Sequence, residues 1–146
     1  RVGIMWRSIF ILCFALHSSV AFVAPIRRAQ GSTFRLEAQV AEVTAEEFER
    51  TVAEGKPSVV DVYAKWCGPC QLLAPELEKV AEHFGERLTF MKMDSDVEPD
   101  IASRLEVYAL PTLLMYKDGK LVTRLEGAFP APMLQEELEK IFFAEA

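Results

Sequence analysis

The sequence predicts an α/β protein in which a central mixed β-sheet is flanked by helices, in the order βαβαβαββα. Two observations support this prediction. Short apolar runs rich in β-branched residues alternate with segments of helical periodicity over residues 40–105. Two further apolar runs then flank Asp118-Gly119, a dipeptide typical of tight hairpins. The alternating part predicts parallel neighbours and the hairpin adds antiparallel ones, so the sheet should be mixed.

The first elements follow from local patterns. Residues 40–43 are expected to form a short edge strand, and Thr44 to Glu47 matches the capping box that opens a helix. This helix should end at Gly55. Residues 58–64 carry apolar side chains at both parities, as expected of a central strand buried on both faces.

The later elements are assigned in the same way. A helix should begin at Cys67 and end at Gly85, since its apolar residues recur at helical spacing. The remaining expected elements are a strand over 88–93, a short helix over 97–105, hairpin strands over 113–116 and 121–125, and a last amphipathic helix over 131–143.

Cys67 and Cys70 lie where the central strand gives way to a helix, with only Gly68 and Pro69 between them. This spacing is short enough to close a disulfide. The first cysteine lies at the helix N-terminus, where free N–H groups and the helix dipole favour the thiolate. We therefore expect Cys67 to be the attacking sulfur and Cys70, one turn deeper, to be the resolving one.

A C-x-x-C pair is also half of many zinc sites, which makes metal binding the first alternative. A tetrahedral site needs two more ligands. The chain has one other cysteine, Cys13, and two histidines, His17 and His83, of which Cys13 and His17 lie in an apolar N-terminal segment. We therefore expect no metal and no separate cofactor, and a Cys67–Cys70 disulfide as the redox group.

Asp61 places one carboxyl group inside the apolar run of the central strand. It could mark a polar edge of that strand. The functional interpretation is an acid buried behind the cysteine pair, whose pKa is raised by desolvation and which exchanges protons with Cys70.

Pro111 precedes the apolar run of the first hairpin strand. Proline is tolerated at the first position of a strand, where its missing N–H is not needed. The same position could instead carry a cis peptide bond that brings a backbone edge beside the active sulfurs.

In combination, these residues resemble the thioredoxin family. The resemblance rests on Asp61, Trp66 with the Cys-Gly-Pro-Cys motif, Pro75, Lys92, Leu110-Pro111-Thr112 and Gly127. It extends from about Val40 to Phe143 and is far more specific than C-x-x-C alone. It implies a thioredoxin fold for residues 37–146 and a protein-disulfide reductase that works by dithiol–disulfide exchange.

The resemblance also implies roles for individual residues. Asp61, with Lys92 nearby, would take the proton from Cys70, while a solvated strand-edge lysine is the alternative for Lys92. Gly68 and Pro69 would tune the redox potential. The target chain would lie beside the attacking cysteine on Trp66, Leu110, Pro111 and Gly127. For Trp66, simple core filling is the alternative.

Within the family, three segments resemble the plastid y-type thioredoxins: 109–112, 117–120 and 126–131. This implies a ferredoxin-dependent thioredoxin reductase as electron donor, and peroxiredoxins and methionine sulfoxide reductases as targets. Two positions depart from the common pattern. Gln71 stands where many members have lysine, and Leu110 where many have isoleucine or threonine, which bears on target choice and removes no catalytic group.

Charge is distributed very unevenly along the chain. Residues 1–36 contain five arginines and no acid, whereas residues 37–146 carry all 22 acidic residues against 11 Lys and Arg, a net charge of −11. Nucleic acid is therefore excluded as an expected partner, since it requires a basic face. The acidity favours solubility and could steer basic partners toward the domain. One domain of this size is expected, acting as a monomer.

Residues 1–36 have the composition of a targeting sequence rather than of a folded element. Residues 1–21, with Met5 as the expected start, resemble a signal peptide with an apolar run too short to anchor the chain in a membrane. Residues 22–36, beginning at Phe22, are arginine-bearing and acid-free, like a transit peptide. Together they resemble the bipartite presequences of algae with secondary plastids, which implies the plastid stroma.

Two other functions remain open from the sequence. The signal-like start also fits a disulfide oxidoreductase or isomerase of the secretory-pathway lumen, although such proteins usually have histidine where this chain has Pro69. The other is a non-catalytic binding subunit that uses the fold as a docking surface, against which the presence of both motif cysteines argues.

Overall fold

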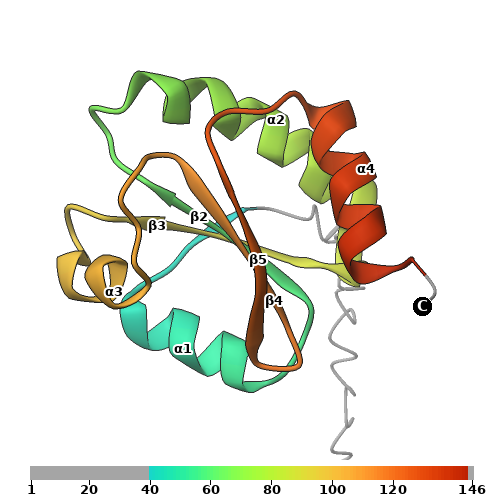
Figure 1. The fold of residues 1–146 in the computed structure, drawn as a ribbon, viewed down its shortest axis with the longest axis horizontal. Helices are drawn as coiled ribbons and strands as arrows, with labels where there is room; N and C mark the ends of the chain where they lie inside the picture. The colour runs from blue at the N-terminus through green and yellow to red at the C-terminus, as the bar shows by residue number, and fades with distance from the viewer. Residues whose placement is uncertain (1–39, 145–146) are drawn as a thin grey trace, which may run out of the picture. The chain divides into compact units, whose positions relative to one another are not determined.

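The computed structural model describes residues 40–144, so the predictions for residues 1–36 lie outside the described part. Its elements, in chain order, are β1 (Ala41–Glu42), α1 (Ala45–Ala53), β2 (Ser58–Tyr63), α2 (Gly68–Phe84), the 3-10 helix η1 (Gly85–Arg87), β3 (Thr89–Asp94), α3 (Pro99–Arg104), β4 (Thr112–Lys117), β5 (Lys120–Glu126) and α4 (Ala131–Phe142) (Figure 1). The predicted order βαβαβαββα is confirmed. No helix in this range is long and apolar enough to cross a membrane.

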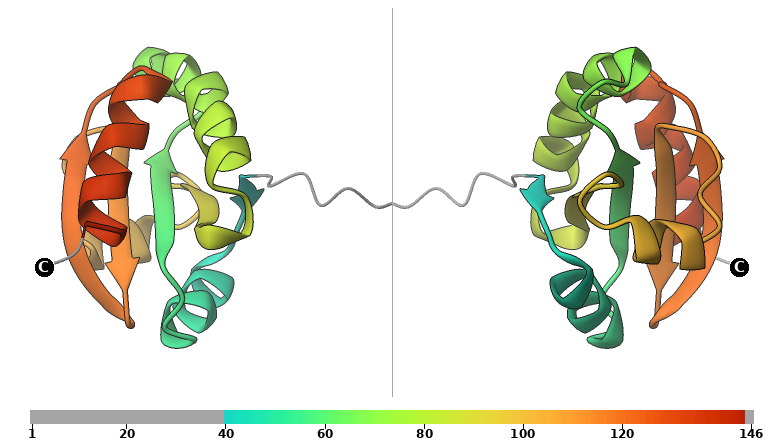
Figure 2. Two further views of the ribbon diagram at one scale, coloured as in Figure 1. Left: turned by 90° about the vertical axis from the view of Figure 1, so that its right-hand side faces the viewer. Right: turned by 90° about the vertical axis from the view of Figure 1, so that its left-hand side faces the viewer.

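The five strands form one mixed sheet in the order β1-β3-β2-β4-β5. β3 pairs in parallel with both β1 and β2, whereas β4 pairs antiparallel with β2 and β5. Figure 2 shows the β4–β5 hairpin and β1 at opposite edges of this sheet. β2 therefore lies in the middle, with a hydrogen-bonded neighbour on each side.

Helices cover both faces of the sheet because β2 is apolar on both faces. Successive side chains of a strand point to opposite sides. Val59 belongs to a core cluster that includes residues of α2 and α4, while Val60 and Val62 belong to a second cluster that includes residues of α1 and α3. Figure 1 shows the same division, with α2 and α4 on one side of the strands and α1 and α3 on the other.

The predicted hairpin is found between β4 and β5. Its turn residues, Asp118 and Gly119, have φ angles of 53° and 75°, both positive as a type I′ turn requires. The two strands extend beyond the expected ranges 113–116 and 121–125, because pairing continues to Lys117 opposite Lys120 and to Thr112 opposite Glu126.

Most other boundaries differ from the predicted ones by one residue, and two differ by more. β1 contains two residues instead of four, because only Ala41 and Glu42 pair with β3. The helix expected from residue 97 begins at Pro99. Residues 94–98 form a turn first, in which the Asp94 carbonyl accepts the N–H groups of Val97 at 3.2 Å and Glu98 at 3.0 Å.

Helices α2 and α4 are joined by a side-chain hydrogen bond as well as by packing. Pro130, the N-cap of α4, supplies no side-chain acceptor for the free N–H groups of the first turn. Glu76 of α2 takes this role, and its Oε2 accepts the Ala131 N–H at 2.7 Å. The pKa of Glu76 is held below its usual value, mainly by the hydrogen bond from the Lys79 ammonium and to a smaller extent by the Ala131 N–H.

Candidate active site

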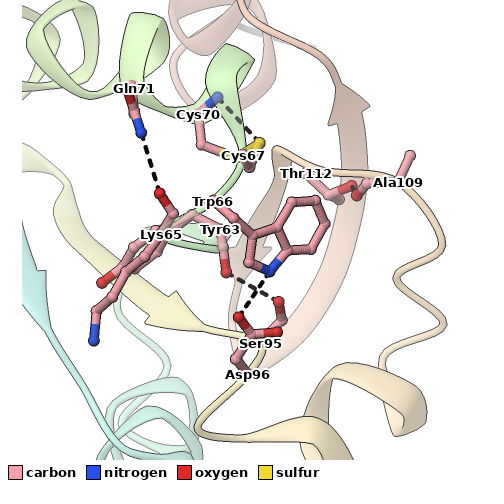
Figure 3. Close-up of a disulfide and its surroundings, with 10 residues drawn as sticks. All are labelled: Tyr63, Lys65, Trp66, Cys67, Cys70, Gln71, Ser95, Asp96, Ala109 and Thr112. Carbon is pink, nitrogen blue, oxygen red and sulfur yellow. Dashed lines mark hydrogen bonds between the residues drawn. A yellow bond between two sulfur atoms is a disulfide. The ribbon is translucent and has the colours of Figure 1, made fainter.

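Cys67 and Cys70 form a disulfide at the start of α2, with their Cα atoms 5.3 Å apart. Cys67 is the N-cap residue and has extended backbone angles, so its side chain turns back toward the helix. The Cys70 N–H donates to Cys67 Sγ at 3.2 Å (Figure 3). Pro69 fits the first turn because the N–H it lacks would have no helical acceptor. The predicted position of this pair at a helix N-terminus is confirmed.

A groove of about 390 Å³ opens beside the disulfide. Its lining residues are Trp66, Cys67, Gly68, Pro69, Ser95, Val107, Tyr108 and Leu110. The two cysteines are almost equally buried, with 4% and 3% of their surface exposed. Contact with the groove distinguishes them, since Cys67 lines it and Cys70 does not.

Trp66 forms one wall of this groove and is 72% exposed, which excludes core filling. Its indole N–H donates to Asp96 Oδ2 at 2.8 Å, as Figure 3 shows. Asp96 is held in turn, because its backbone N–H donates to Asp94 Oδ1 at 3.0 Å. The Lys65 ammonium lies 3.4 Å from Asp94 Oδ2. This chain of polar contacts fixes the orientation of the indole ring.

The segment before β4 approaches the groove through Leu110, which is half-buried and lines it. The Leu110–Pro111 peptide bond is cis, the second of the two possibilities left open by the sequence. Pro111 is buried, and its carbonyl accepts the Gly127 N–H at 2.8 Å. Pro111 and Gly127 are thus joined to each other behind Leu110, and neither lines the groove.

Asp61 lies in the middle of β2 and is 4% exposed, so its interpretation as a polar strand edge is wrong. It has the same strand parity as Val59 and therefore faces the layer of α2, the helix that carries Cys70. Its Oδ1 has no hydrogen-bond partner among the described residues. Burial raises the pKa of Asp61 to about 7, while Lys92 acts in the opposite direction.

Lys92 is the register partner of Asp61 on β3. β3 lies between β1 and β2, so Lys92 is not on an edge strand. Its ammonium lies 3.9 Å from Glu42 Oε2 and 5.8 Å from the centre of the Tyr63 ring. The Tyr63 hydroxyl also donates to Glu42, at 3.1 Å. The positive charge of Lys92 is therefore shared between Asp61 and Glu42.

Three residues of the groove were not predicted from the sequence: Ser95, Val107 and Tyr108. Val107 and Tyr108 immediately precede the segment that contains Pro111, and this proximity is the signal that could have indicated them. Ser95 and its neighbour Asp96 follow β3. Asp96 lies 30 residues after Trp66 in the sequence, and no local pattern connects either residue to the cysteine motif.

Comparison with known proteins decides the family. The family model for thioredoxin matches residues 39–140. The chain belongs to the thioredoxin family. A chloroplastic thioredoxin Y of rice is 40% identical over 117 residues, which cover 80% of this chain and 67% of the relative. Thioredoxin Y2, chloroplastic, of Arabidopsis thaliana is 46% identical over 84 residues, covering 58% of this chain and 50% of the relative.

The structural comparison agrees. A crystal structure of chloroplastic thioredoxin z superposes with a TM-score of 0.66 at 37% sequence identity, covering 70% of this chain and 94% of that one. The predicted family and thioredoxin fold are confirmed, and with them the class of chemistry, because thioredoxins are thiol–disulfide oxidoreductases. Within residues 40–144, no group of three or more His, Cys, Asp or Glu side chains is arranged to hold a metal ion.

Proposed function

We propose that this chain is a thioredoxin that reduces protein disulfides in the plastid, with Cys67 as the attacking and Cys70 as the resolving thiol. One observation carries the proposal. The sulfur of Cys67 lies at the N-cap of α2 on the wall of an open groove, while Cys70 lies behind it in the first turn. A target disulfide entering this groove meets Cys67 first.

The reaction starts from the reduced pair. The Cys67 thiolate attacks one sulfur of the target disulfide, that disulfide breaks, and the other target sulfur leaves as a thiolate that takes up a proton. The Cys70 thiol then loses its proton, and its thiolate attacks Cys67 Sγ. The mixed disulfide breaks and the second target thiol is released. The target gains two electrons and two protons, and the Cys67–Cys70 disulfide is formed.

The described contacts support these roles. The Cys70 N–H points at Cys67 Sγ at 3.2 Å, and the N-terminus of α2 adds its partial positive charge, so both stabilise a thiolate at Cys67. Asp61, whose pKa is about 7, is available as a base at neutral pH and lies in the layer that α2 covers. Lys92, its register partner, favours the charged form of Asp61.

Gly68 and Pro69 shape the turn that holds the two sulfurs, and we assign them to redox tuning. Trp66 and Leu110 are assigned to target binding because they line the groove. Pro111 and Gly127 contribute through the hydrogen bond that joins them behind Leu110. The disulfide is the only redox group that the proposal requires.

Partners and location follow from the relatives and the N-terminal composition. Chloroplastic thioredoxins among the relatives support the plastid, and the y-type segments support a ferredoxin-dependent thioredoxin reductase as donor. The proposed targets are disulfide-containing proteins such as peroxiredoxins and methionine sulfoxide reductases. The acid-free residues 1–36 would form the presequence, and residues 37–146 the thioredoxin domain of a monomer.

The reaction is tested by trapping. In a Cys13→Ser background, Cys70→Ser should accumulate mixed disulfides with target proteins, because the attacking thiol is present and the resolving thiol is absent. Adding Cys67→Ser to the same chain is the matched control and should abolish trapping. Equal trapping by the control would contradict the assignment of Cys67.

The location is tested with a reporter fused to residues 1–36. The wild-type segment should deliver the reporter to the plastid stroma by way of the secretory membrane. Phe22→Ala should leave entry into the secretory pathway intact and stop the second step, because the apolar run before it is unchanged. Accumulation of the wild-type reporter in the secretory lumen would support a lumenal oxidoreductase instead.

A further inference from the structure

The groove beside Cys67 is larger and more apolar than the approach of one sulfur atom requires. Its volume of about 390 Å³ lies within the range of small-ligand pockets, about 300–1,000 Å³. Apart from the cysteine motif itself, its walls are Trp66, Val107, Tyr108, Leu110 and Ser95. Four of these five side chains are large and apolar or aromatic, so the groove can accept more of a target than its sulfur.

Tyr108 is the wall residue with the highest exposure. Its side chain is 87% exposed, and Trp66 in the same groove is 72% exposed. A single exposed aromatic residue is ordinary on a protein surface. Two aromatic residues that line one groove next to a reactive sulfur form a connected surface of the kind that marks a binding site.

The backbone that carries Tyr108 is held on both sides. Before it, the Val107 N–H donates to the Ala102 carbonyl at 3.1 Å. After it, the Thr112 hydroxyl donates to the Ala109 carbonyl at 2.7 Å. These two hydrogen bonds hold the backbone on either side of Tyr108 before a target binds, which lowers the conformational entropy lost on binding.

A side chain of β5 holds the same loop from the other direction. The guanidinium of Arg124 donates to the Glu106 carbonyl at 2.9 Å and to the Leu105 carbonyl at 3.3 Å. Glu106 has a φ angle of 54°, in the left-handed region that non-glycine residues seldom occupy. Arg124 thus secures an unusual turn, and that turn directs the following two residues into the groove.

We propose that Tyr108 is a specificity-determining residue. With Trp66 and Leu110 it forms a subsite for a large apolar or aromatic side chain that flanks the reacting cysteine of the target. The proposal rests on the proposed function, because a chain that reacts with Cys67 must place the residues next to its disulfide in this groove. The substrate class is therefore protein disulfides in exposed segments with an apolar flank.

The expected preference is modest and measurable. Burying an apolar side chain against these walls removes it from water, whereas a serine flank gains little from the same contact. Contacts between aromatic rings are typically worth enough to change a rate or binding constant by about threefold to tenfold. The effect should be found in kcat/KM, since it acts on the encounter with the target.

The test uses two disulfide peptides that differ only in the residues flanking one cysteine, Leu-Phe in one and Ser-Ser in the other. The full chain with Cys13→Ser is reduced, freed of reductant and mixed with each peptide, and the second-order rate of peptide reduction is measured. We expect the Leu-Phe peptide to react about threefold to tenfold faster. Tyr108→Ala should remove most of this ratio, and Tyr108→Phe should keep it.

Two controls separate recognition from folding. Val122→Ala, on the exposed face of β5, removes another exposed apolar side chain and should leave the ratio unchanged. The small polar disulfide bis(2-hydroxyethyl) disulfide should react equally fast with Tyr108→Ala and its parent. An equal loss for both peptides and the small disulfide would show a structural role and overturn the proposal.

Other outcomes are equally decisive. If the parent reduces both peptides at the same rate, Tyr108 does not select an apolar flank, and disulfide reduction by Cys67 still stands. If the parent reduces neither peptide, the proposed function itself fails, and the inference about Tyr108 fails with it.

Discussion

The two faces of β2 are built from neighbouring residues and differ in what they contain. Val60 and Val62 point into the layer of α1 and α3 and belong to a hydrophobic cluster there. The buried side chains of Ser58 and Thr112 on this face carry hydroxyl groups and no carboxyl group. Val59 and Asp61 point into the layer of α2 and α4, where a carboxyl oxygen is buried without a hydrogen-bond partner among the described residues. Only the second face gives up stability for a buried carboxyl group, in the layer covered by α2, the helix that carries Cys70.

The two faces of β2 should differ most in how their contributions to folding stability depend on pH. Asp61 has a pKa of about 7 in the folded chain against an ordinary value of 3.8. Between these values the folded protein holds a proton that the unfolded chain has released. Stability from this group therefore falls as pH rises from about 4 to about 7. No described residue of the layer of α1 and α3 is a buried carboxyl group with a raised pKa, so the contribution of this layer to stability should not change over this range.

The largest effect is expected at the disulfide. Cys67→Ser should lower protein-disulfide reduction by about a thousandfold or more, because no other described thiol lines the groove. The measurement is turnover with a protein disulfide. Cys13→Ser is the matched control and should keep full activity. If Cys67→Ser were as active as the parent, Cys67 would not be the attacking thiol.

Leu114→Ala tests the opposite face. Leu114 is fully buried in the layer of α1 and α3, and its truncation leaves a cavity. The expected cost is about 2–5 kcal/mol in the free energy of unfolding, measured with denaturant. The reduction rate per folded molecule should stay within about twofold of the parent. A reduction rate per folded molecule that is tenfold lower than that of the parent would show that this layer also contributes to catalysis.

Asp61→Asn should remove the pH dependence that distinguishes the face of α2 and α4 from the opposite face. At pH 8 it removes a buried negative charge and should raise the free energy of unfolding by on the order of 2–4 kcal/mol. Near pH 4 the gain should largely disappear, because Asp61 is then protonated in the folded chain and about half protonated in the unfolded chain. Turnover should slow, since Cys70 loses its proposed base. A gain that is the same at both pH values would contradict the titration of Asp61.

Ser58→Ala gives the smallest effect. Ser58 is fully buried at the start of β2, and its hydroxyl has no hydrogen-bond partner among the described residues. Replacing an unsatisfied hydroxyl by a methyl group should change the free energy of unfolding by no more than about 1 kcal/mol, in the stabilising direction. Thermal or denaturant unfolding at pH 5 and pH 8 should give the same change. A marked loss of stability would show that the hydroxyl is satisfied.

Most of the fold could be predicted because its signals are local. The capping box of Thr44, the Asp118-Gly119 turn and the helix from the cysteine motif each depend on a few adjacent residues, and each is found as predicted. Boundaries were less predictable. The start of α3 depends on hydrogen bonds that the Asp94 carbonyl accepts, and these do not follow from helical periodicity.

The site was predictable where the motif is contiguous and less so where it depends on distant residues. Cys67, Gly68, Pro69 and Trp66 are neighbours in the chain, so their common position follows from one pattern. The contact of Trp66 with Asp96 joins residues 30 positions apart. The groove wall at Tyr108 depends on a loop held by Arg124, 18 positions from the carbonyl of Glu106. Such contacts arise from the tertiary fold and leave no spacing signal.

The Ala131 amide offers an experimental view of the helix that carries the site. Its hydrogen is held by the carboxylate of Glu76, which belongs to α2, whereas ordinary helix-start amides depend on their own cap. Hydrogen exchange at the Ala131 amide should therefore be slow only while α2 and α4 are packed together. Exchange measured for the oxidised and the reduced chain would report, from one backbone position, whether opening the disulfide loosens the attachment of α2.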